Sequence, residues 1–399
     1  MLRRKLAVWA ALLLAPGVLG AQSDRLVVVV GFDGFRRSYF DQDSLPELHA
    51  LAADGVVADA MIPSFPSVTF PNWYAMATGL YPEHTGIVNN SFWDPDFHAG
   101  FRISDSTARQ GRWYGGEPIW NTATRQGHRV GTMFWVGSDA GVGGTNPTYW
   151  RPFDRKVSFD DRIAQIFAWI DLPAGQRPDL VMMYFEEPDH TGHDFGPDDP
   201  RTAAAAARVD SALARIVAGL RARGLFDRTD LVVVADHGMA TVAPDRQIYL
   251  TDAVDSAAVR VSSLSPLLLI SPVDGDVPAL RQRLSRLAHV TVWRKEELPA
   301  RFHYGDNPRI TPLVGLVDVG WTLEASRRDT LRGRGNHGYD NADPAMAALF
   351  VAHGPAFRAG ARLPAFPNVD VYDLIAHLLG VRPAANDGSL DPFSGALIR

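Results

Sequence analysis

The sequence predicts an α/β fold in which a mainly parallel central sheet is sandwiched by helices, with a small α+β insertion. Three apolar runs, at residues 26–31, 180–185 and 231–235, each end abruptly in polar or ionisable residues. Continuous apolar strands are typical of a sheet that is covered on both faces. Helix-like stretches at 160–170 and 201–219 separate these runs, which indicates crossover connections between parallel strands.

The C-terminal part of the chain contributes to the same core. Residues 346–352 are apolar and are followed by His-Gly-Pro, so they predict one more core strand. Residues 371–379 have apolar side chains at helical spacing and predict a helix that closes the fold. The core is therefore expected to draw on both ends of the chain.

The pattern changes between residues 243 and 334. There the sequence predicts a β-rich segment at 259–271, a helix at 277–287 and a strand at 290–293. A β-α-β unit of this size suits an insertion carried on the main sheet. We expect one domain over residues 22–399 with this insertion, around 243–334, inside it.

Composition narrows the class of protein. The chain has 399 residues, of which 46% are apolar and 21% charged, as in ordinary globular proteins. Its formal net charge of −6 gives no reason to expect binding to duplex nucleic acid or to anionic membranes, so a small anionic substrate has to be held by local cations. No signal for an oligomer is legible.

The N-terminus has the pattern of a secretory signal peptide. Arg3, Arg4 and Lys5 precede an apolar run at 6–14 that is too short to span a bilayer. We expect a signal peptide over residues 1–21 and a periplasmic or secreted protein without a stable membrane anchor after cleavage; a retained anchor is the alternative. The absence of cysteine excludes disulfides.

Residues of metal-ligand type gather after the predicted strands. Asp189 and His193 are four residues apart, so on a helical turn both can face one metal ion. In parallel sheets such sites lie at the carboxyl ends of the strands. Three aspartates and three histidines favour zinc, with manganese or iron as alternatives, whereas all-oxygen ligands would suit magnesium or calcium. The six candidate ligands are Asp33, Asp189, His193, Asp236, His237 and His337.

Any one of these residues has an ordinary alternative role. A single aspartate after a strand is commonly a helix cap or a turn residue, and a lone histidine is commonly a satisfied surface or core group. The occurrence of all six at predicted strand ends and in glycine-rich turns favours metal binding.

Thr69 is the candidate nucleophile. It precedes an apparent helix within Pro-Ser-Phe-Pro-Ser-Val-Thr-Phe-Pro-Asn, and a helix start offers free N–H groups and a favourable dipole for an anionic oxygen. A coordinated metal ion can stabilise its deprotonated oxygen. Ser64 and Ser67 are rival nucleophiles, and a simple capping role for Thr69 is the structural alternative.

These motifs together resemble those of a bacterial nucleotide pyrophosphatase/phosphodiesterase of the alkaline phosphatase superfamily. The resemblance covers nearly the whole mature chain and implies an alkaline phosphatase-like fold. It rests on Gly-Phe-Asp-Gly-Phe (31–35), Pro-Ser-Val-Thr-Phe-Pro-Asn (66–72), Gly-Ile-Val-Asn-Asn (86–90), Phe-Trp-Val-Gly-Ser-Asp (134–139), Tyr-Phe-Glu-Glu-Pro-Asp-His-Thr-Gly-His (184–193), Ala-Asp-His-Gly-Met (235–239), Gly-Asn-His-Gly-Tyr-Asp (335–340) and Pro-Asn-Val-Asp-Val-Tyr (367–372).

The resemblance implies two Zn²⁺ per chain and zinc-dependent hydrolysis of nucleotide phosphodiester or pyrophosphate bonds through a covalent threonyl-phosphate, releasing a nucleoside monophosphate. It assigns Asn90 and the Thr69 backbone N–H to a phosphoryl oxygen, and Phe70 and Tyr184 to the walls of a nucleobase slot. It also divides the ligands between the two ions: Asp189, His193 and His337 hold one zinc, and Asp33, Asp236 and His237 hold the other. The Thr69 oxygen is implied to bind the second of these ions.

Two other activities and one non-catalytic function compete with this expectation. An alkaline phosphomonoesterase of the same superfamily needs an extra cation near Thr69, for which Arg36 and Arg37 are the candidates. A sulfatase needs a Cys or Ser in a Cys/Ser-x-Pro-x-Arg segment, which is absent at Thr69. A non-catalytic metal- or phosphate-binding protein would be marked by a missing nucleophile, whereas Thr69 is present. Basic residues near 151–156 offer electrostatic steering of anionic substrates, although ordinary surface charge explains them equally.

Overall fold

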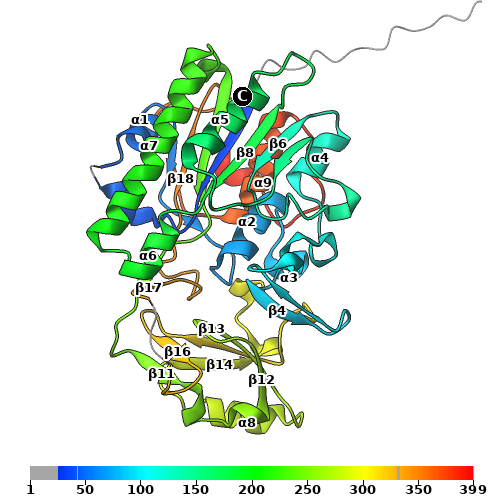
Figure 1. The fold of residues 1–399 in the computed structure, drawn as a ribbon, viewed down its shortest axis with the longest axis vertical. Coiled ribbons are helices and arrows are strands. Elements are labelled where there is room, and N and C mark those ends of the chain that lie inside the picture. The colour runs from blue at the N-terminus through cyan, green and yellow to red at the C-terminus, as the bar shows by residue number, and fades with distance from the viewer. Residues whose placement is uncertain (1–25, 43, 330–332, 399) are drawn as a thin grey trace, which may run out of the picture.

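A computed structural model of the chain describes residues 26–42, 44–329 and 333–398 (Figure 1). The signal peptide predicted over residues 1–21 lies outside these described residues. At the centre is an eight-stranded sheet with the order β19-β2-β18-β9-β1-β8-β6-β7. Its strands are β1 (Leu26–Phe32), β2 (Val56–Ala58), β6 (Val130–Met133), β7 (Tyr149–Arg151), β8 (Leu180–Phe185), β9 (Thr229–Ala235), β18 (Phe350–His353) and β19 (Ala361–Leu363).

The middle of this sheet is parallel and wholly buried. β1 pairs in parallel with both β8 and β9, and every residue of these three strands is buried. β18 pairs antiparallel with β9 and with β2, and is the one strand of this sheet that runs against the others. The predicted mainly parallel sheet is therefore confirmed.

Helices cover both faces of the sheet. Figure 1 shows α1, α5 and α7 on one side and α2, α4 and α9 on the other. The longest, α7, begins at a strong signal, because Asp199 accepts the Arg201 N–H and Pro200 occupies its first position. No helix of the described residues is long and apolar enough to cross a membrane. The helices are α1 (Pro46–Ala53), α2 (Thr69–Thr78), α3 (Pro82–Thr85), α4 (Ile119–Arg125), α5 (Phe159–Ile170), α6 (Asp189–Phe195), α7 (Pro200–Ala222) and α9 (Val371–Leu379).

One core strand is shorter than predicted. The apolar run at 346–352 forms strand only from Phe350, and ends one residue later than expected, at His353. Met346, Ala348 and Leu349 are fully buried, but they lie in an irregular segment that packs beside β9 and the loops after it. Burial of a loop therefore produced the same apolar pattern as a strand.

A second, four-stranded sheet with the order β12-β13-β15-β14 occupies the lower part of Figure 1. Its elements are β12 (Val259–Ser263), β13 (Leu267–Pro272), α8 (Val277–Leu284), β14 (Val290–Arg294) and β15 (Leu313–Val317). The segment predicted as one β-rich run is a hairpin, because β12 and β13 pair antiparallel. β13, α8 and β14 form the expected β-α-β unit, but β15, which the sequence did not reveal, lies between its two strands. We call residues 243–334 the insertion.

Candidate active site

The candidate ligands converge because their strands are neighbours. Asp33 directly follows β1, Asp236 and His237 directly follow β9, and Asp189 begins α6 shortly after β8. Since β1 lies between β8 and β9, all three chain segments leave the sheet at the same edge. The Asp189 N–H donates to the Asp33 carbonyl at 3.0 Å, which ties two of these segments together.

Two groups of side chains can each bring their ligand atoms within 4.8 Å of one another. One contains Asp33, Asp236 and His237, as expected, and the other contains Asp189, His237 and His337. His193 lies close to the second group, with its Nε2 3.1 Å from His337 Nε2 and 3.5 Å from Asp189 Oδ2. All six predicted ligands are thus brought together, and His237 lies between the two groups.

The three histidines His193, His237 and His337 all present their Nε2 to the site, because each Nδ1 faces a main-chain carbonyl. His193 Nδ1 lies 3.0 Å from the Gly335 carbonyl, His237 Nδ1 2.9 Å from the Gly238 carbonyl, and His337 Nδ1 2.9 Å from the Ser67 carbonyl. A carbonyl only accepts, so each Nδ1 donates and, in the neutral ring, each Nε2 carries a lone pair. Two such lone pairs 3.1 Å apart, on His193 and His337, repel unless a cation lies between them. Metal-binding histidines are oriented in this way.

The carboxylates also suit a cation. Within the described residues, Asp33 Oδ1, Asp189 Oδ1 and Asp236 Oδ2 are buried oxygens without a hydrogen-bond partner. Burial, reinforced by Asp236, raises the pKa of Asp33 well above its ordinary value. Buried and unpaired carboxylates are costly unless they are compensated. The donor set therefore fits divalent metal ions.

The protonation of the histidines follows their surroundings. Burial lowers the pKa of His337 well below its ordinary value, and His237 and His193 lower it further. Burial acts in the same direction on His237, but Asp236, Asp189 and the Gly238 carbonyl together outweigh it and raise the pKa of that ring. A neutral His337 retains the lone pair that a metal ligand needs.

Thr69 lies beside these groups, at the first residue of α2. Its Oγ1 is 3.4 Å from His237 Nε2, and its N–H has no acceptor within the described part of the chain. Val68, at the N-cap, supplies no side-chain cap, so the start of the helix remains able to bind an anion. The rival serines are both buried and engaged elsewhere, since Ser64 donates to Asn368 Oδ1 and Ser67 donates to the Tyr339 carbonyl.

Asn90 is fixed against the same helix. Its Oδ1 accepts the Phe70 N–H at 2.9 Å, so its Nδ2 is left as a donor. Asn90 also continues the hairpin formed by β4 (Ser91–Asp94) and β5 (Ala99–Arg102), because its carbonyl accepts the Ile103 N–H at 3.1 Å. Phe70 packs edge-on against Phe101 of that hairpin, with ring centroids 6.0 Å apart.

A pocket of about 650 Å³ opens beside Asp33 and Thr69. Phe70 and Tyr184 both line it, as expected. Tyr184 has a second role that the sequence did not reveal, because its hydroxyl donates to Asp33 Oδ2 at 2.5 Å and the residue is only 8% exposed. Phe153, also missed, is 38% exposed, lines the pocket and contacts Tyr184 edge-on at 5.9 Å. A lone aromatic in a loop gave no periodic signal.

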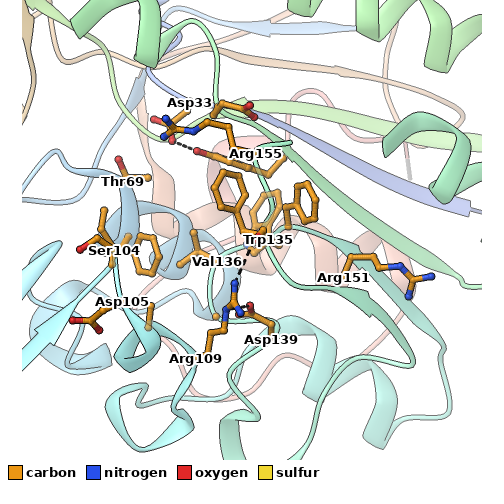
Figure 2. Close-up of a pocket in the computed structure, with 18 of the residues that line it drawn as sticks. Asp33, Thr69, Ser104, Asp105, Arg109, Trp135, Val136, Asp139, Arg151 and Arg155 are labelled. Carbon is orange, nitrogen blue, oxygen red and sulfur yellow. Dashed lines mark hydrogen bonds and ion pairs between the residues drawn. The ribbon is translucent and has the colours of Figure 1, made fainter. Parts of the chain in front are cut away.

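Figure 2 shows Asp33 and Thr69 at one end of the pocket and Arg109 beside Asp139 at the other. Arg109 Nε lies 3.3 Å from Asp139 Oδ2. Arg151 and Arg155 line the pocket as well, although the Arg151 guanidinium points away from the other labelled side chains. Arg109 and Asp139 therefore make the distal end of the pocket polar and charged.

Arg36 and Arg37 do not supply a cation to this pocket. Arg36 binds Asp198 at 3.1 Å and the Met239 carbonyl, and Arg37 binds Asp41 at 3.0 Å and the Ala58 carbonyl. Neither residue lines the pocket. The cations considered for a phosphomonoesterase are thus committed elsewhere.

Comparisons with known proteins identify relatives with this architecture. The profile of the family described as type I phosphodiesterase / nucleotide pyrophosphatase matches residues 27–340. The venom phosphodiesterase CdcPDE of Crotalus durissus collilineatus is 36% identical over 375 residues, covering 91% of this chain and 45% of the relative. Ectonucleotide pyrophosphatase/phosphodiesterase family member 5 of Homo sapiens is 34% identical over 367 residues, covering 91% of this chain and 76% of the relative. The chain spans about half the length of the venom enzymes it matches.

A solved structure gives the same result. Murine ectonucleotide pyrophosphatase/phosphodiesterase 5, in an inactive threonine-to-alanine variant in complex with AMP, superimposes with a TM-score of 0.90 at 35% sequence identity. The match covers 94% of this chain and 100% of the murine one. The alkaline phosphatase-like fold predicted from the sequence is therefore confirmed.

Proposed function

Since the chain belongs to the type I phosphodiesterase / nucleotide pyrophosphatase family, we propose that it hydrolyses nucleotide phosphodiester or pyrophosphate bonds and releases a nucleoside monophosphate. One observation carries this proposal. The Thr69 hydroxyl lies 3.4 Å from His237 Nε2, beside two groups of candidate metal ligands and at the end of an aromatic-lined pocket. The AMP-bound murine relative supports a nucleotide as the occupant.

The proposal includes two Zn²⁺ per chain. Asp189, His193 and His337 would hold one ion, and Asp33, Asp236 and His237 the other. When bound, such ions neutralise phosphate charge and favour the deprotonated form of a coordinated hydroxyl. Oxygen and imidazole ligands in equal number support zinc over magnesium or calcium.

The protein groups then have distinct tasks. Thr69 Oγ1 loses its proton to solvent and attacks phosphorus, so that a threonyl-phosphate forms as the bond to the leaving oxygen breaks. The leaving oxygen departs with its electron pair and takes a proton from solvent. Water then cleaves the bond between Thr69 Oγ1 and phosphorus, which restores the hydroxyl and releases the nucleoside monophosphate.

Neighbouring residues hold the reacting phosphate in place. Asn90 Nδ2 and the Thr69 N–H donate to a non-bridging phosphoryl oxygen at the start of α2. Phe70 and Tyr184 border the nucleobase slot, and Phe153 adds an aromatic face to it. Tyr184 also donates to Asp33, which orients that carboxylate.

The test compares two substrates. We would measure kcat/KM of the zinc-loaded mature protein for a nitrophenyl ester of a nucleoside monophosphate and for nitrophenyl phosphate under identical conditions. A large preference for the diester is expected. Preference for the monoester would overturn the proposal in favour of an alkaline phosphomonoesterase, and no hydrolysis of either would favour a non-catalytic binding protein.

Export of the protein is part of the same proposal. The relatives are named as venom enzymes and ectonucleotide enzymes, which supports a periplasmic or secreted location. A small-molecule nucleotide or other phosphodiester is the proposed partner, rather than duplex nucleic acid or a membrane. Expression of the full chain with separation of cell fractions tests the location, and retention of all the protein in the cytoplasm would contradict it.

A further inference from the structure

We propose that Arg309, a residue of the insertion, is a positioning residue that fixes Asn90 at the start of α2. This inference rests on the proposed function, because it takes Asn90 as the donor to the phosphoryl oxygen. None of the candidate ligand groups within the described residues contains a residue of the insertion. The insertion would therefore act on the reaction by supporting Asn90.

Arg309 holds both ends of the segment that carries Asn90. Its Nη1 donates to the Gly86 carbonyl at 2.7 Å, and its Nε donates to Asp94 Oδ2 at 2.6 Å. Gly86 and Asp94 each lie four residues from Asn90, on opposite sides of it. One guanidinium group thus fixes the segment 86–94 at both limits.

The guanidinium is itself enclosed. Its Nη1 also donates to the Trp113 carbonyl at 2.6 Å, and its Cζ lies 5.2 Å from the Phe92 ring and 5.6 Å from the Trp113 ring. The side chains of Arg309 and Asp94 are 11% and 5% exposed. A buried, multiply bonded arginine has little freedom to move, and its planar group sets the direction of each bond.

Asp94 extends this support into the hairpin. Its Oδ1 accepts the N–H groups of Asp96 and Phe97, both at 2.8 Å, in the turn between β4 and β5. Although burial opposes ionisation, the Phe97 N–H and Arg309 lower the pKa of Asp94, so the carboxylate is charged at neutral pH. The hairpin that extends from Asn90 is thereby closed at its far end.

Other contacts from the insertion reach the same segment. The Tyr304 hydroxyl donates to the Val88 carbonyl at 2.9 Å, two residues before Asn90. Ser91 Oγ donates to the Ser262 carbonyl of β12 at 3.4 Å. At Gly86, whose φ is +77°, an added Cβ would lie 2.5 Å from Arg309 Nη1, so the guanidinium is seated directly on this turn.

The consequence for the reaction is geometric. Asn90 Oδ1 accepts the Phe70 N–H, and this bond sets where Nδ2 can donate. A displacement of about 1 Å at such a donor can lower the rate by about 10²-fold. Loosening the segment 86–94 should therefore lower kcat while leaving the nucleobase slot, and hence KM, nearly unchanged.

The first test is a double-mutant cycle on the zinc-loaded enzyme. Arg309→Lys keeps the charge but places one nitrogen where arginine places two, so it cannot reach Asp94 and both carbonyls with the same geometry. We expect kcat for a nitrophenyl nucleotide ester to fall at least about tenfold. In an Asn90→Ala background the same substitution should change kcat less than about twofold, because the donor is already absent. If Arg309→Lys lowers kcat by the same factor in the Asn90→Ala background as in the wild type, the proposal is overturned.

The second test needs no turnover. The Phe70 amide has Asn90 Oδ1 as its acceptor, so its hydrogen exchange reports the position of Asn90 directly. Exchange at Phe70 should accelerate about tenfold or more in Asn90→Ala and in Arg309→Lys. If wild-type protein fails to hydrolyse diesters, the proposed function fails, and this measurement still decides the role of Arg309. An unchanged Phe70 exchange rate in Arg309→Lys would overturn it.

Two further variants complete the design. Tyr304→Phe removes only the bond to the Val88 carbonyl and should give a smaller effect in the same direction, which keeps the proposal testable if Arg309→Lys fails to fold. Arg223→Lys is the matched control, since Arg223 also pairs with an aspartate, Asp171 at 2.7 Å, and lies over a ring, Phe167, at the ends of α7 and α5. It should alter neither kcat nor Phe70 exchange.

Discussion

The main region and the insertion differ in what they bury. The main sheet and its loops enclose several ionisable side chains, among them Asp33, Asp236 and Asp370. Within the described residues of the insertion, the buried polar side-chain groups are Thr322 and the Tyr304 hydroxyl, and one of its enclosed clusters is aliphatic. Burial of carboxylates opposes folding unless they are compensated, so the close pair Asp33 and Asp236 marks the candidate site for chemistry. The insertion instead offers rigid support.

The largest contrast should come from the same substitution made in both regions. Thr69→Ala removes the proposed nucleophile and should lower kcat for a nucleotide ester by at least about 10³-fold, with the zinc content unchanged. Thr291→Ala, at an exposed residue of β14 in the insertion, should leave kcat near the wild-type value. Steady-state kinetics with elemental analysis measures both. Substantial activity in Thr69→Ala would assign the nucleophile to another group.

A pair of histidines sharpens the contrast for metal binding. His193→Ala should reduce bound zinc by about one ion per chain and lower kcat/KM at least about 10²-fold, since even partners behind metal ligands contribute about 10- to 100-fold. His289, in the insertion, contacts Asp318 at 3.0 Å on an exposed surface, and His289→Ala should retain both ions. Elemental analysis and reactivation of chelator-treated protein provide the measurements. Equal zinc content in the two variants would rule out the assigned ligand set.

Aromatic side chains allow a test at the substrate pocket. Phe153→Ala should raise KM for the nucleotide ester about tenfold with a small change in kcat, because stacking on a base contributes about 1–3 kcal/mol. Tyr249→Ala, on β11 (Gln247–Tyr249) of the insertion, should leave KM unaltered. If KM responds equally to both substitutions, the nucleobase does not occupy the pocket beside Phe153.

The smallest effect concerns stability. Burial raises the pKa of Asp370 from 3.8 to about 6, although the Ser389 N–H partly offsets this. Between these pH values the folded protein binds more protons than the unfolded chain, so this group lowers stability as pH rises from about 4 to 6. Asp370→Asn should abolish that component, and its stability relative to wild type should increase over this range by no more than about 3 kcal/mol. Urea unfolding at pH 4.5 and 7 measures it, and a difference independent of pH would contradict it.

Long apolar runs between clear breaks were the predictable part of the fold. β8 and α9 have the predicted bounds, and β1 and β9 differ from them by one or two residues. Short strands such as β2 and β15 were missed, because three to five apolar residues next to glycine do not differ from a buried loop. The prediction of a strand over 346–352 was wrong for its first four residues, because a buried loop there has the same apolar pattern as a strand.

The candidate site also has a part that local sequence pattern could predict and a part that it could not. The six proposed ligands could be named in advance because each stands beside a strand end or a glycine turn. Phe153 and Arg309 could not, since each acquires its role from distant parts of the chain. Arg309 is 215 positions from Asp94, and nothing local to either residue indicates the other.

The orientation of the three histidines has a consequence for how this protein can diverge. In many metal sites a carboxylate side chain behind each imidazole sets the ring, and a single codon change can delete it. Here the Gly335, Gly238 and Ser67 carbonyls perform that task, and no substitution can remove a main-chain oxygen. The orientation of these imidazoles therefore does not depend on the identity of any side chain behind them, and a substitution can disturb it only by moving the main chain.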